Sequence, residues 1–494
     1  MSIFKACDIR GVYPNELNEA TYADLGSAIG TLLRERTPTP HVVVAGDVRP
    51  STPLLRAALI DGLVETGCSV TDLGLVPTPV AYFAARQHPC DGIAIVTASH
   101  NPPKYNGLKV CLGPMPITEE EMERVAAAVA ARRFASGRGG VRRISAEEDY
   151  AAFLCGGASP GDGFRVVLDC GNGSYSELAP RVLRLLGYDV VELFCTPDGT
   201  FPNRSPNPSV PENLGALHRA VREAGAAIGL ALDGDGDRLA IVDDLGRSLT
   251  GDQAIILLAR HILSSALPAE ERNAKFQIPN ARLQSAPRDS AFGIDSAFGI
   301  RHSAFPPRPS EKVVIDIKCS QAVANAVHAC GGTALLERSG HTFIKTRMIA
   351  DHALFGGELS GHFFYRQLAG GDDGLYSILR AAELAREAGE PISKITDAMP
   401  HYATTPDIRV PYAASDGPAR LDQIAAAATG EVLRLDGVRV AYPDGWGLVR
   451  CSVTEPLLTF RFEAFEGSPR RIAERLLAAT PDLLARVLKR LGPR

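Results

Sequence analysis

The chain of 494 residues has no strong excess of either charge, no long apolar run and no paired cysteine motif. Its net charge of −5 and its pI of about 6.2 argue against a general nucleic-acid-binding protein. The most apolar stretch, residues 254–267, is interrupted by Arg260 and His261 and is too short to cross a membrane. The first residues do not have the pattern of a secretion signal.

The ten cysteines are scattered, and no two of them form a C-x-x-C pair. Several lie in predicted strands, as Cys170 does. This distribution suits buried thiols in a reducing compartment better than disulfides or a zinc site. We therefore expect a cytoplasmic protein that acts on small molecules and binds neither nucleic acid nor membranes.

A strand–helix–strand pattern occurs three times, in a chain too long for a single core. The predicted strands, helices and second strands are 41–47, 53–66 and 68–73; 165–169, 178–186 and 189–193; and 312–316, 322–330 and 333–337. Continuous Val, Ile and Leu runs are typical of a sheet covered on both faces. The second and third repeats share a motif, a basic residue, two valines, an apolar residue and Asp. This motif favours three related α/β domains over α/β units that only look alike.

Changes of composition predict the domain boundaries. Residues 132–140 and 156–163 are rich in turn-forming residues. After Met399 the pattern changes to short alternating strands, expected at 407–410, 437–441, 447–452 and 457–462, with one helix at 472–477. The last region is therefore expected to be a smaller α+β domain. The predicted domains are 1–145, 146–248, 249–401 and 402–494.

One segment does not fit an α/β domain. The hexapeptide Asp-Ser-Ala-Phe-Gly-Ile occurs twice in tandem, from Asp289 and from Asp295, with prolines on both flanks. Two copies of six residues cannot build a solenoid. We expect 270–310 to be a largely disordered insertion. Its Phe and Ile content leaves docking on a neighbouring surface as the alternative.

The most informative motif is Asp233-Gly-Asp235-Gly-Asp237-Arg238, which follows a predicted buried strand at 227–232. Alternating carboxylates on an extended loop can place three oxygens on one hard cation, and glycine lets the backbone wrap around it. An EF-hand is excluded, because its sixth and twelfth positions would be Arg238 and Asp244. A solvated acidic turn is the alternative. Open α/β sheets bind ligands at this end of their strands.

A second motif, residues 97–102, places Ser99 beside His100 after an apolar run. Ser99 could be a nucleophile on a turn, or it could only stabilise the turn. Lys109, ten residues further on, could act as an acid or base or neutralise a phosphate. The segment 157–161 matches the hydrolase pattern G-x-S-x-G, but it lacks the preceding strand and is taken as a chance match.

Two later motifs carry hydrogen-bonding side chains at alternate positions. Residues 357–362 present Glu358, Ser360 and His362 between glycines, which suits the recognition of sugar hydroxyls or is a plain loop. Residues 450–456 offer one guanidinium and two hydroxyls, from Arg450, Ser452 and Thr454. That set could clamp a phosphate, or it could belong to a half-exposed strand.

Together with Ala6-Cys7-Asp8-Ile9-Arg10-Gly11, these motifs resemble the α-D-phosphohexomutase family, in its bacterial phosphomannomutase/phosphoglucomutase branch. Their order matches along nearly the whole chain. The resemblance implies three similar α/β/α domains with mixed sheets and a smaller α+β C-terminal domain around a central cleft. Two positions depart from many relatives: Cys7 replaces a tyrosine and Val453 replaces an asparagine.

The resemblance also implies a role for each candidate. Ser99 would be the phosphoserine, and one of its oxygens would join Asp233, Asp235 and Asp237 in holding Mg²⁺. The remaining implied residues are Arg10, Lys109 and Arg238 around the reacting phosphate; His100 and His341 as further catalytic residues; Lys318, Glu358, Ser360 and His362 at the sugar; and Arg450, Ser452 and Thr454 at the second phosphate.

The implied reaction interconverts hexose 1-phosphate and hexose 6-phosphate, of glucose or mannose, through a bisphosphorylated intermediate. Glucose 1,6-bisphosphate would be the activator, and the protein would be a monomer or weak dimer. A phosphoglucosamine mutase is an alternative, although such enzymes usually carry glutamine in place of Leu359. A metal-dependent phosphatase and a phosphosugar-binding protein without turnover are the others.

Overall fold

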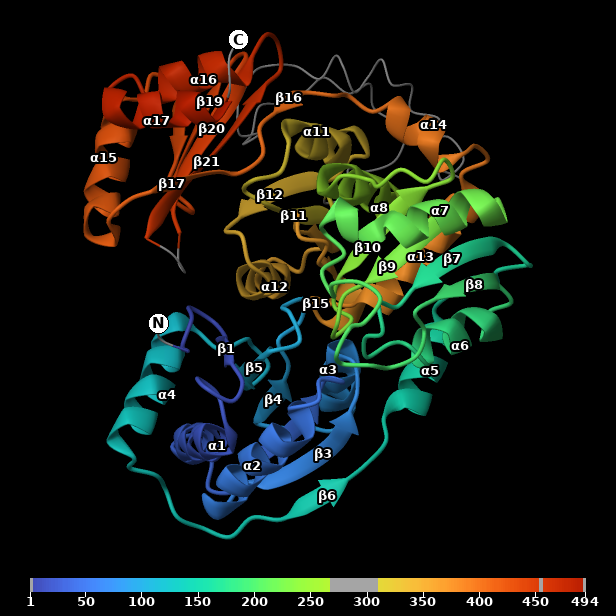
Figure 1. Ribbon diagram of the computed structural model, residues 1–494, viewed down its shortest axis with the longest axis vertical. Coiled ribbons are helices and arrows are strands. Elements are labelled where there is room, and N and C mark those ends of the chain that lie inside the picture. Colours follow the sequence, from blue (N-terminus) through green and yellow to red (C-terminus); the bar gives the residue numbers. More distant parts are fainter. Residues whose placement is uncertain (1–2, 267–309, 453–455, 492–494) are drawn as a thin grey trace. The chain divides into compact units, whose positions relative to one another are not determined.

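A computed structural model of the chain describes residues 3–266, 310–452 and 456–491 (Figure 1). The predicted insertion, apart from Ser310, lies outside these residues. The chain divides into two compact units. Unit 1 comprises Met1–Ala254, Met348–Ala350 and Ser360–Asp397, and unit 2 comprises Ile255–Arg347, Asp351–Leu359 and Ala398–Arg494.

The first part of unit 1 is a six-stranded mixed sheet in the order β1-β5-β4-β2-β3-β6. Its elements are β1 (Ile9–Val12), α1 (Glu19–Arg34), β2 (His41–Gly46), α2 (Thr52–Glu65), β3 (Ser69–Leu75), α3 (Thr78–Gln87), β4 (Gly92–Val96), β5 (Tyr105–Leu112), α4 (Glu119–Ala131) and β6 (Val141–Arg143). Central β2 is parallel to β3 and β4, and β5 is antiparallel to β4. Helices α1 and α2 approach closely because each places a glycine, Gly26 or Gly62, against the other's backbone. The strand–helix–strand pattern predicted at 41–73 is confirmed.

The second part of unit 1 is the sheet β10-β9-β7-β8, in which β7 is parallel to its neighbours and β9 and β10 form an antiparallel hairpin. Its elements are α5 (Glu147–Gly156), β7 (Arg165–Asp169), α6 (Leu178–Leu185), β8 (Asp189–Leu193), the 3₁₀ helix η1 (Pro211–Leu214), α7 (Gly215–Ala224), β9 (Ile228–Leu232) and β10 (Leu239–Asp243). The predicted β7, α6 and β8 are confirmed. The acidic motif is the hairpin turn itself, so the strands fix both of its ends.

A later stretch of chain returns to unit 1. It contains β14 (Phe363–Tyr365), the 3₁₀ helix η2 (Arg366–Leu368), β15 (Gly371–Asp372), α13 (Gly374–Glu387) and α14 (Ile392–Asp397). Helix α13 packs on β9 and β10 (Figure 1). Its N-cap is Asp373, whose side chain accepts the backbone N–H of Tyr376. The N–H of Gly374 donates to the carbonyl of Gly236, so the start of α13 supports the acidic loop.

Unit 2 begins with the parallel strands β12-β11-β13. Its first elements are α8 (Gly251–Ser265, which starts in unit 1), β11 (Lys312–Asp316), α11 (Gln321–Ala329), β12 (Thr333–Glu337), α12 (His341–Ala350, which ends in unit 1) and β13 (Phe355–Gly357). The predicted β11, α11 and β12 are confirmed. Most of α8 is buried, so the described part of the apolar stretch, from Ala254 to Ser265, forms a core helix. Among the described residues, no helix has both the length and the apolar character needed to cross a membrane.

The C-terminal part of unit 2 is an antiparallel sheet, β16-β21-β20-β19-β18, with β17 also paired to β21. Its elements are β16 (Ala403–Thr404), β17 (Ile408–Pro411), the 3₁₀ helix η3 (Ala414–Asp416), α15 (Gly417–Ala427), β18 (Glu431–Leu433), β19 (Val438–Tyr442), β20 (Gly445–Cys451), β21 (Leu457–Ala464), α16 (Pro469–Leu476) and α17 (Pro481–Leu491). The sequence predicted β17, β19, β20, β21 and α16, but not α15 or α17. This part contacts β11's end, where Arg439 Nη1 donates to the carbonyl of Ile317 at 2.7 Å.

Candidate active site

Ser99 lies on the turn that follows β4, and its side chain contacts the acidic loop. Ser99 is 2% exposed, and its φ of 49° lies in the left-handed region, which costs a residue with a β-carbon about 1–2 kcal/mol. Its Oγ donates a 2.8 Å hydrogen bond to Oδ2 of Asp233 and lies 3.3 Å from Nδ1 of His100. The structure thus brings together the two motifs that are 134 positions apart in sequence.

The acidic loop is buried and tightly shaped. Its three aspartates, Asp233, Asp235 and Asp237, are each at most 1% exposed. Gly236 has a φ of 83°, and a β-carbon there would lie 2.2 Å from the Tyr175 ring, so this turn requires glycine. Oδ1 of Asp233 accepts the backbone N–H of Gly236 at 3.0 Å. These contacts hold the loop against the sheet.

Lys109 on β5 is the nearest cation to this loop. Its Nζ donates to Oδ2 of Asp235 at 2.8 Å and also contacts Asp237. Burial opposes the charge on Lys109, but the two carboxylates outweigh it and raise the lysine pKa. Burial, with the charges of Asp237 and Asp235, raises the pKa of Asp233 well above its ordinary value. Lys109 and Arg238 therefore offset only part of the repulsion among the three carboxylates.

The same carboxylates fit a hard divalent cation. One oxygen from each of Asp233, Asp235 and Asp237 lies within 4.8 Å of the others. Oδ1 of Asp235 is buried and has no hydrogen-bond partner, which is costly for a carboxylate unless a cation takes that position. The three aspartates could therefore hold a metal ion. A second group, Asp237, His362 and Asp372, has the same spacing and shares Asp237.

Two arginines add positive charge beside Ser99. Arg10 donates through Nε to Asp8 at 2.8 Å and through Nη1 to the carbonyl of Thr97 at 3.2 Å. Nε of Arg238 lies 3.8 Å from Oδ2 of Asp233. Burial, followed by the charges of Arg238 and Arg10, lowers the pKa of His100 to about 2. The His100 imidazole is therefore neutral at pH 7, and the positive charge beside Ser99 comes from the arginines and Lys109.

Part of the predicted sugar-binding loop joins this site in unit 1. Nε of Arg238 donates to Nε2 of His362 at 3.2 Å, and Nδ1 of His362 lies 3.0 Å from Oγ of Ser360. The hydroxyl of Ser209 donates to the carbonyl of Ser360 at 2.7 Å. Ser360 and His362 therefore belong to the same cluster as Ser99.

The other sugar-binding candidates lie in unit 2. Nζ of Lys318 lies 3.7 Å from Oδ2 of Asp316 and 4.0 Å from Oδ2 of Asp407. Burial acts against the charge on Lys318, but Asp316, Asp407 and Glu358 raise its pKa. Glu358 is 8% exposed, and His341 begins α12.

The predicted phosphate clamp is only partly described. Nη1 of Arg450 lies 2.9 Å from Oδ2 of Asp436. The backbone N–H of Ser452 donates to the carbonyl of Leu457 at 2.9 Å, which continues the β20–β21 pairing. Thr454 and the departure at Val453 lie outside the described residues. The charge of Arg450 acts on Lys318, so these two cations are neighbours within unit 2.

Sequence reasoning missed several side chains that shape the site. Thr78, at the start of α3, donates its hydroxyl to Asp235 at 2.7 Å. Asp372, just before α13, lies 3.7 Å from Nε2 of His362. A buried pair, Asp47 and Arg49, lies beneath the Ser99 turn. The only signal in the sequence was a D-x-R after a strand, which also occurs in ordinary surface turns.

The G-x-S-x-G segment is a chance match, as predicted. Its serine, Ser159, follows helix α5 and not a strand. The N–H of Ser159 donates to Oε1 of Glu383 on α13 at 2.7 Å. This contact is part of the packing of α13, and the segment does not stand between a strand and a helix as a hydrolase nucleophile does.

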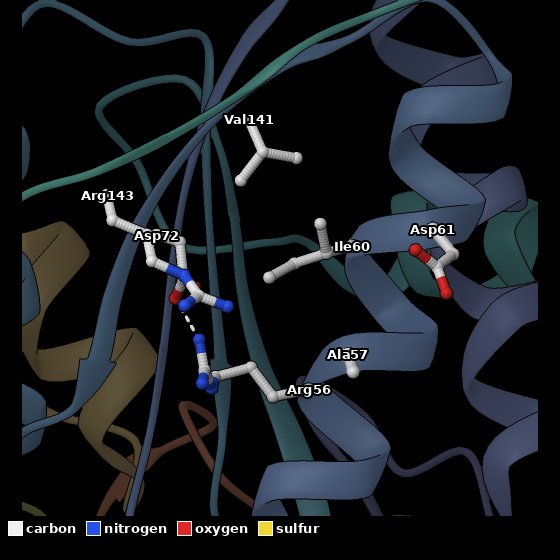
Figure 2. Close-up of a pocket in the computed structure, with 7 residues that line it drawn as sticks. All are labelled: Arg56, Ala57, Ile60, Asp61, Asp72, Val141 and Arg143. Carbon is white, nitrogen blue, oxygen red and sulfur yellow. Dashed lines mark hydrogen bonds and ion pairs between the residues drawn. The ribbon is translucent and has the colours of Figure 1, made fainter.

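A separate surface pocket of about 380 Å³ lies between α2, β3 and β6 (Figure 2). Figure 2 shows Arg56 and Arg143 converging on Asp72; Nε of Arg143 is 3.3 Å from Oδ2 of Asp72, and Arg56 contacts its other oxygen. Asp72 thus neutralises part of the charge of both arginines. None of the predicted site residues lines this pocket.

Four family models match the chain in the expected order. They describe phosphoglucomutase/phosphomannomutase α/β/α domain I at residues 1–136, domain II at 148–246, domain III at 300–402 and the C-terminal domain at 408–479. The chain belongs to the phosphoglucomutase/phosphomannomutase family. This membership confirms the predicted family, the predicted fold class and the predicted class of enzyme, an isomerase of hexose phosphates.

Individual members of the family are similar over nearly the full length. A phosphomannomutase/phosphoglucomutase of Pseudomonas putida is 34% identical over 491 residues, which cover 98% of this chain and 97% of the relative. A phosphoglucomutase of Neisseria meningitidis is 34% identical over 471 residues, covering 94% and 93%. The crystal structure of a phosphoglucomutase/phosphomannomutase family protein from Burkholderia thailandensis matches with a TM-score of 0.82 and 34% identity, covering 97% and 98%.

Proposed function

We propose that this chain interconverts the 1-phosphates and 6-phosphates of glucose, mannose or both through phospho-Ser99. The observation that carries the proposal is the position of Ser99, whose Oγ lies 2.8 Å from Asp233 in a buried loop of three carboxylates. Lys109, Arg10 and Arg238 lie around that loop or the Ser99 turn. A nucleophile between a cation site and fixed positive charges is the arrangement that phosphoryl transfer needs.

The first transfer moves the phosphoryl group from the enzyme to the sugar. The free hydroxyl of a hexose 1-phosphate attacks the phosphorus of phospho-Ser99, a bond forms to O6, and the bond to Oγ breaks. The hydroxyl proton leaves O6, and a proton returns to Oγ. Arg10, Lys109 and Arg238 neutralise the phosphoryl oxygens throughout, because such transfers depend chiefly on positioning and charge.

The second transfer runs in the opposite sense. The bisphosphorylated sugar turns around, Oγ of Ser99 attacks the phosphorus on O1, and the bond from that phosphorus to O1 breaks. The product is hexose 6-phosphate, and Ser99 is phosphorylated again. Glucose 1,6-bisphosphate would charge an unphosphorylated enzyme by the same step.

Asp233, Asp235, Asp237 and a phosphoserine oxygen would hold Mg²⁺. When bound, the ion supplies positive charge that stabilises the transferred phosphoryl group. The chain's own contribution is to keep the three carboxylates buried and to aim Ser99 at them. The unpartnered oxygen of Asp235 supports this assignment.

The remaining candidates would bind the rest of the substrate. Glu358 and Lys318, with Ser360, His362 and His341, would contact sugar hydroxyls. Arg450, Ser452 and Thr454 would hold the phosphate that is not reacting, since an arginine can bind phosphate through two parallel N–H groups. We also propose the division into domains 1–145, 146–248, 249–401 and 402–494, and a monomer or weak dimer in solution.

A coupled assay tests the proposal. Conversion of glucose 1-phosphate to glucose 6-phosphate is followed with Mg²⁺ and a trace of glucose 1,6-bisphosphate, and mannose 1-phosphate and glucosamine 1-phosphate are compared. We expect Ser99→Ala to lower kcat at least about 10³-fold, because it removes the nucleophile. The matched control is Ser159→Ala, which should retain full activity.

Three results would overturn the proposal. Turnover that survives in Ser99→Ala would remove the phosphoserine from the reaction. Release of inorganic phosphate without formation of hexose 6-phosphate would establish a phosphatase. Faster turnover of glucosamine 1-phosphate than of either hexose phosphate would assign the chain to the alternative substrate.

A further inference from the structure

Both peptide groups of Ser99 are connected to one buried ion pair. The N–H of Ser99 donates to Oγ1 of Thr97 at 2.8 Å, and that hydroxyl donates to Oδ2 of Asp47 at 2.8 Å. On the other side, Nη2 of Arg49 donates to the carbonyl of Ser99 at 2.8 Å. Nε of Arg49 donates to the same Oδ2 of Asp47 at 2.9 Å. The network closes around a residue in the left-handed conformation.

Arg49 uses every N–H of its guanidinium in this network. Besides Asp47 and Ser99, it donates to the carbonyls of Asn101 at 2.7 Å, Pro102 at 2.8 Å and Tyr105 at 3.1 Å. Four of its five acceptors are therefore carbonyls of the turn that carries Ser99. Arg49 is 0% exposed. A lysine has the same charge but only three donors at one point, and could not reach these acceptors together.

The same arginine also adjoins the second part of unit 1. The Phe201 ring lies over the Arg49 guanidinium, with 5.1 Å between Cζ and the ring centroid. A β-carbon added to Gly234 in the acidic loop would lie 2.7 Å from the carbonyl oxygen of Ser99 and 3.2 Å from Phe201. Arg49 thus lies where the serine turn and the acidic loop approach most closely.

We propose that Arg49 is a positioning residue for phosphoryl transfer: with Asp47, it holds Ser99 in its left-handed conformation so that Oγ faces the acidic loop in both transfers. This inference rests on the proposed function. The hydrogen bonds that the Arg49 side chain donates go to Asp47 and to backbone carbonyls, so it acts through the Ser99 backbone. A displacement of the nucleophile by about 1 Å can lower a rate about 10²-fold.

A purely structural role for Arg49 would have a different signature. If Arg49 only stabilised the first sheet, its loss would lower the melting temperature and the folded fraction, but kcat per folded molecule would not change. KM should not change in either case, because the sugar and second-phosphate candidates are other residues. The change in kcat per folded molecule therefore separates the two roles.

Arg49→Lys is the first variant, with kcat and KM normalised to the folded fraction measured by circular dichroism. We expect kcat to fall about 100-fold, while KM for the hexose 1-phosphate stays within about threefold. The matched control is Arg34→Lys, at the end of helix α1 in the same part of unit 1, because Nη1 of Arg34 also donates to a backbone carbonyl, that of Thr66, at 3.0 Å. The control should lose stability only.

Thr97→Val keeps the test decisive if Arg49→Lys does not fold. It removes only the hydroxyl between Asp47 and the Ser99 N–H, and we expect a smaller loss, about tenfold in kcat with KM unchanged. Phosphorylation of Ser99 by glucose 1,6-bisphosphate, read as an added 80 Da by intact mass, should slow in parallel.

The outcomes separate the two proposals. Wild-type protein that neither turns over nor takes up phosphate would refute the proposed function. An active wild type whose Arg49→Lys and Thr97→Val variants keep wild-type kcat per folded molecule would refute the positioning role of Arg49. An equal loss in Arg34→Lys would also refute it, because the effect would then be general.

Discussion

Three aspartates, Asp47, Asp169 and Asp316, end the first strands of the three strand–helix–strand repeats, and they share one backbone contact. In each repeat, Oδ1 accepts the N–H of the residue two positions later, at 3.1 Å for Arg49, 2.8 Å for Gly171 and 3.0 Å for Lys318. The turn is therefore repeated in detail, which supports duplication. The repeats differ in the cation that neutralises the aspartate.

In the first repeat the cation is Arg49, two positions after the aspartate. In the second repeat that position is Gly171, and the cation comes from Arg204, 35 residues beyond Asp169. Nε of Arg204 donates to both oxygens of Asp169, at 3.0 and 2.9 Å. A β-carbon at Gly171 would lie 2.6 Å from Cζ of Arg204. The guanidinium thus fills the space that the side chain of the first repeat occupies.

In the third repeat, the aspartate holds its cation less tightly. Lys318 stands two positions after Asp316, but its Nζ is 3.7 Å from Oδ2, an oxygen that is buried without a hydrogen-bond partner. The Lys318 side chain is 19% exposed, whereas that of Arg204 is 3% exposed. Two repeats use arginine to fix a loop, and the third keeps the donors of its lysine for other groups. This difference agrees with the proposed contact between Lys318 and the sugar.

The largest effect is expected from Arg204→Met. Removing one partner of a buried pair leaves an uncompensated charge, so we expect the free energy of unfolding to fall by about 3–5 kcal/mol, measured by urea denaturation. The control is Arg165→Met, whose pair with Asp189 is about half exposed and should contribute about 1 kcal/mol or less. Equal losses in the two variants would show that Arg204 does not fix the second repeat.

Gly171→Ala tests whether Arg204 occupies the missing side-chain position. Alone, we expect it to lower the free energy of unfolding by about 2–3 kcal/mol, from the contact with the guanidinium and from the φ of 53°. In an Arg204→Ala background only the backbone strain of about 1 kcal/mol should remain. A double-mutant cycle in urea measures the difference. Additive effects would contradict the shared position.

A feature of this protein could be predicted when the pattern that indicates it lies within one short stretch of sequence. The strands before Asp169 and Asp316 were predictable, because continuous apolar runs ending in a turn residue are local patterns. The order of the motifs was enough to select Ser99 and the acidic loop. Arg204 was not predictable, because it reaches Asp169 from a loop that has no spacing in common with the first repeat.

Other parts of the site were missed because the sequence does not show which side chains are buried. In the sequence, Asp47 and Arg49 resemble an ordinary charged turn. Only the structure shows that they are 1% and 0% exposed and that Arg49 contacts the Ser99 carbonyl. Helix α13 was missed as a support of the acidic loop, because nothing local shows that a segment after residue 360 packs on β9 and β10. Helix α15 lacked a pattern strong enough to separate it from a loop, whereas α17 was missed although its apolar residues Leu483, Val487 and Leu491 follow helical spacing. Tertiary contacts, and not motifs, supply these parts of the site.

The smallest effect is expected from Asp316→Asn, and it depends on pH. The amide has the same shape and can still accept the N–H of Lys318, so the loss should come from the charge facing Nζ, about 1 kcal/mol or fivefold in KM for the hexose 1-phosphate. Burial raises the pKa of Asp316 above 3.8, and Lys318 only partly offsets this shift. A raised pKa means that the folded state holds this proton more tightly than the unfolded state does.

The sign of the pH dependence follows. The contribution of Asp316 to stability is fully present below about pH 4 and is lost as pH rises through the native pKa, whereas asparagine does not titrate. The stability advantage of the wild type over Asp316→Asn, measured by urea denaturation at several pH values, should therefore shrink as pH rises from about 4. Ser339→Ala is the matched variant, because the Ser339 hydroxyl donates to Oδ1 of Asp316 at 2.6 Å and lowers its pKa. Its removal should raise the native pKa further and make stability fall more steeply with pH. A difference that stays constant with pH in both variants would show that Lys318 offsets the effect of burial on Asp316 completely.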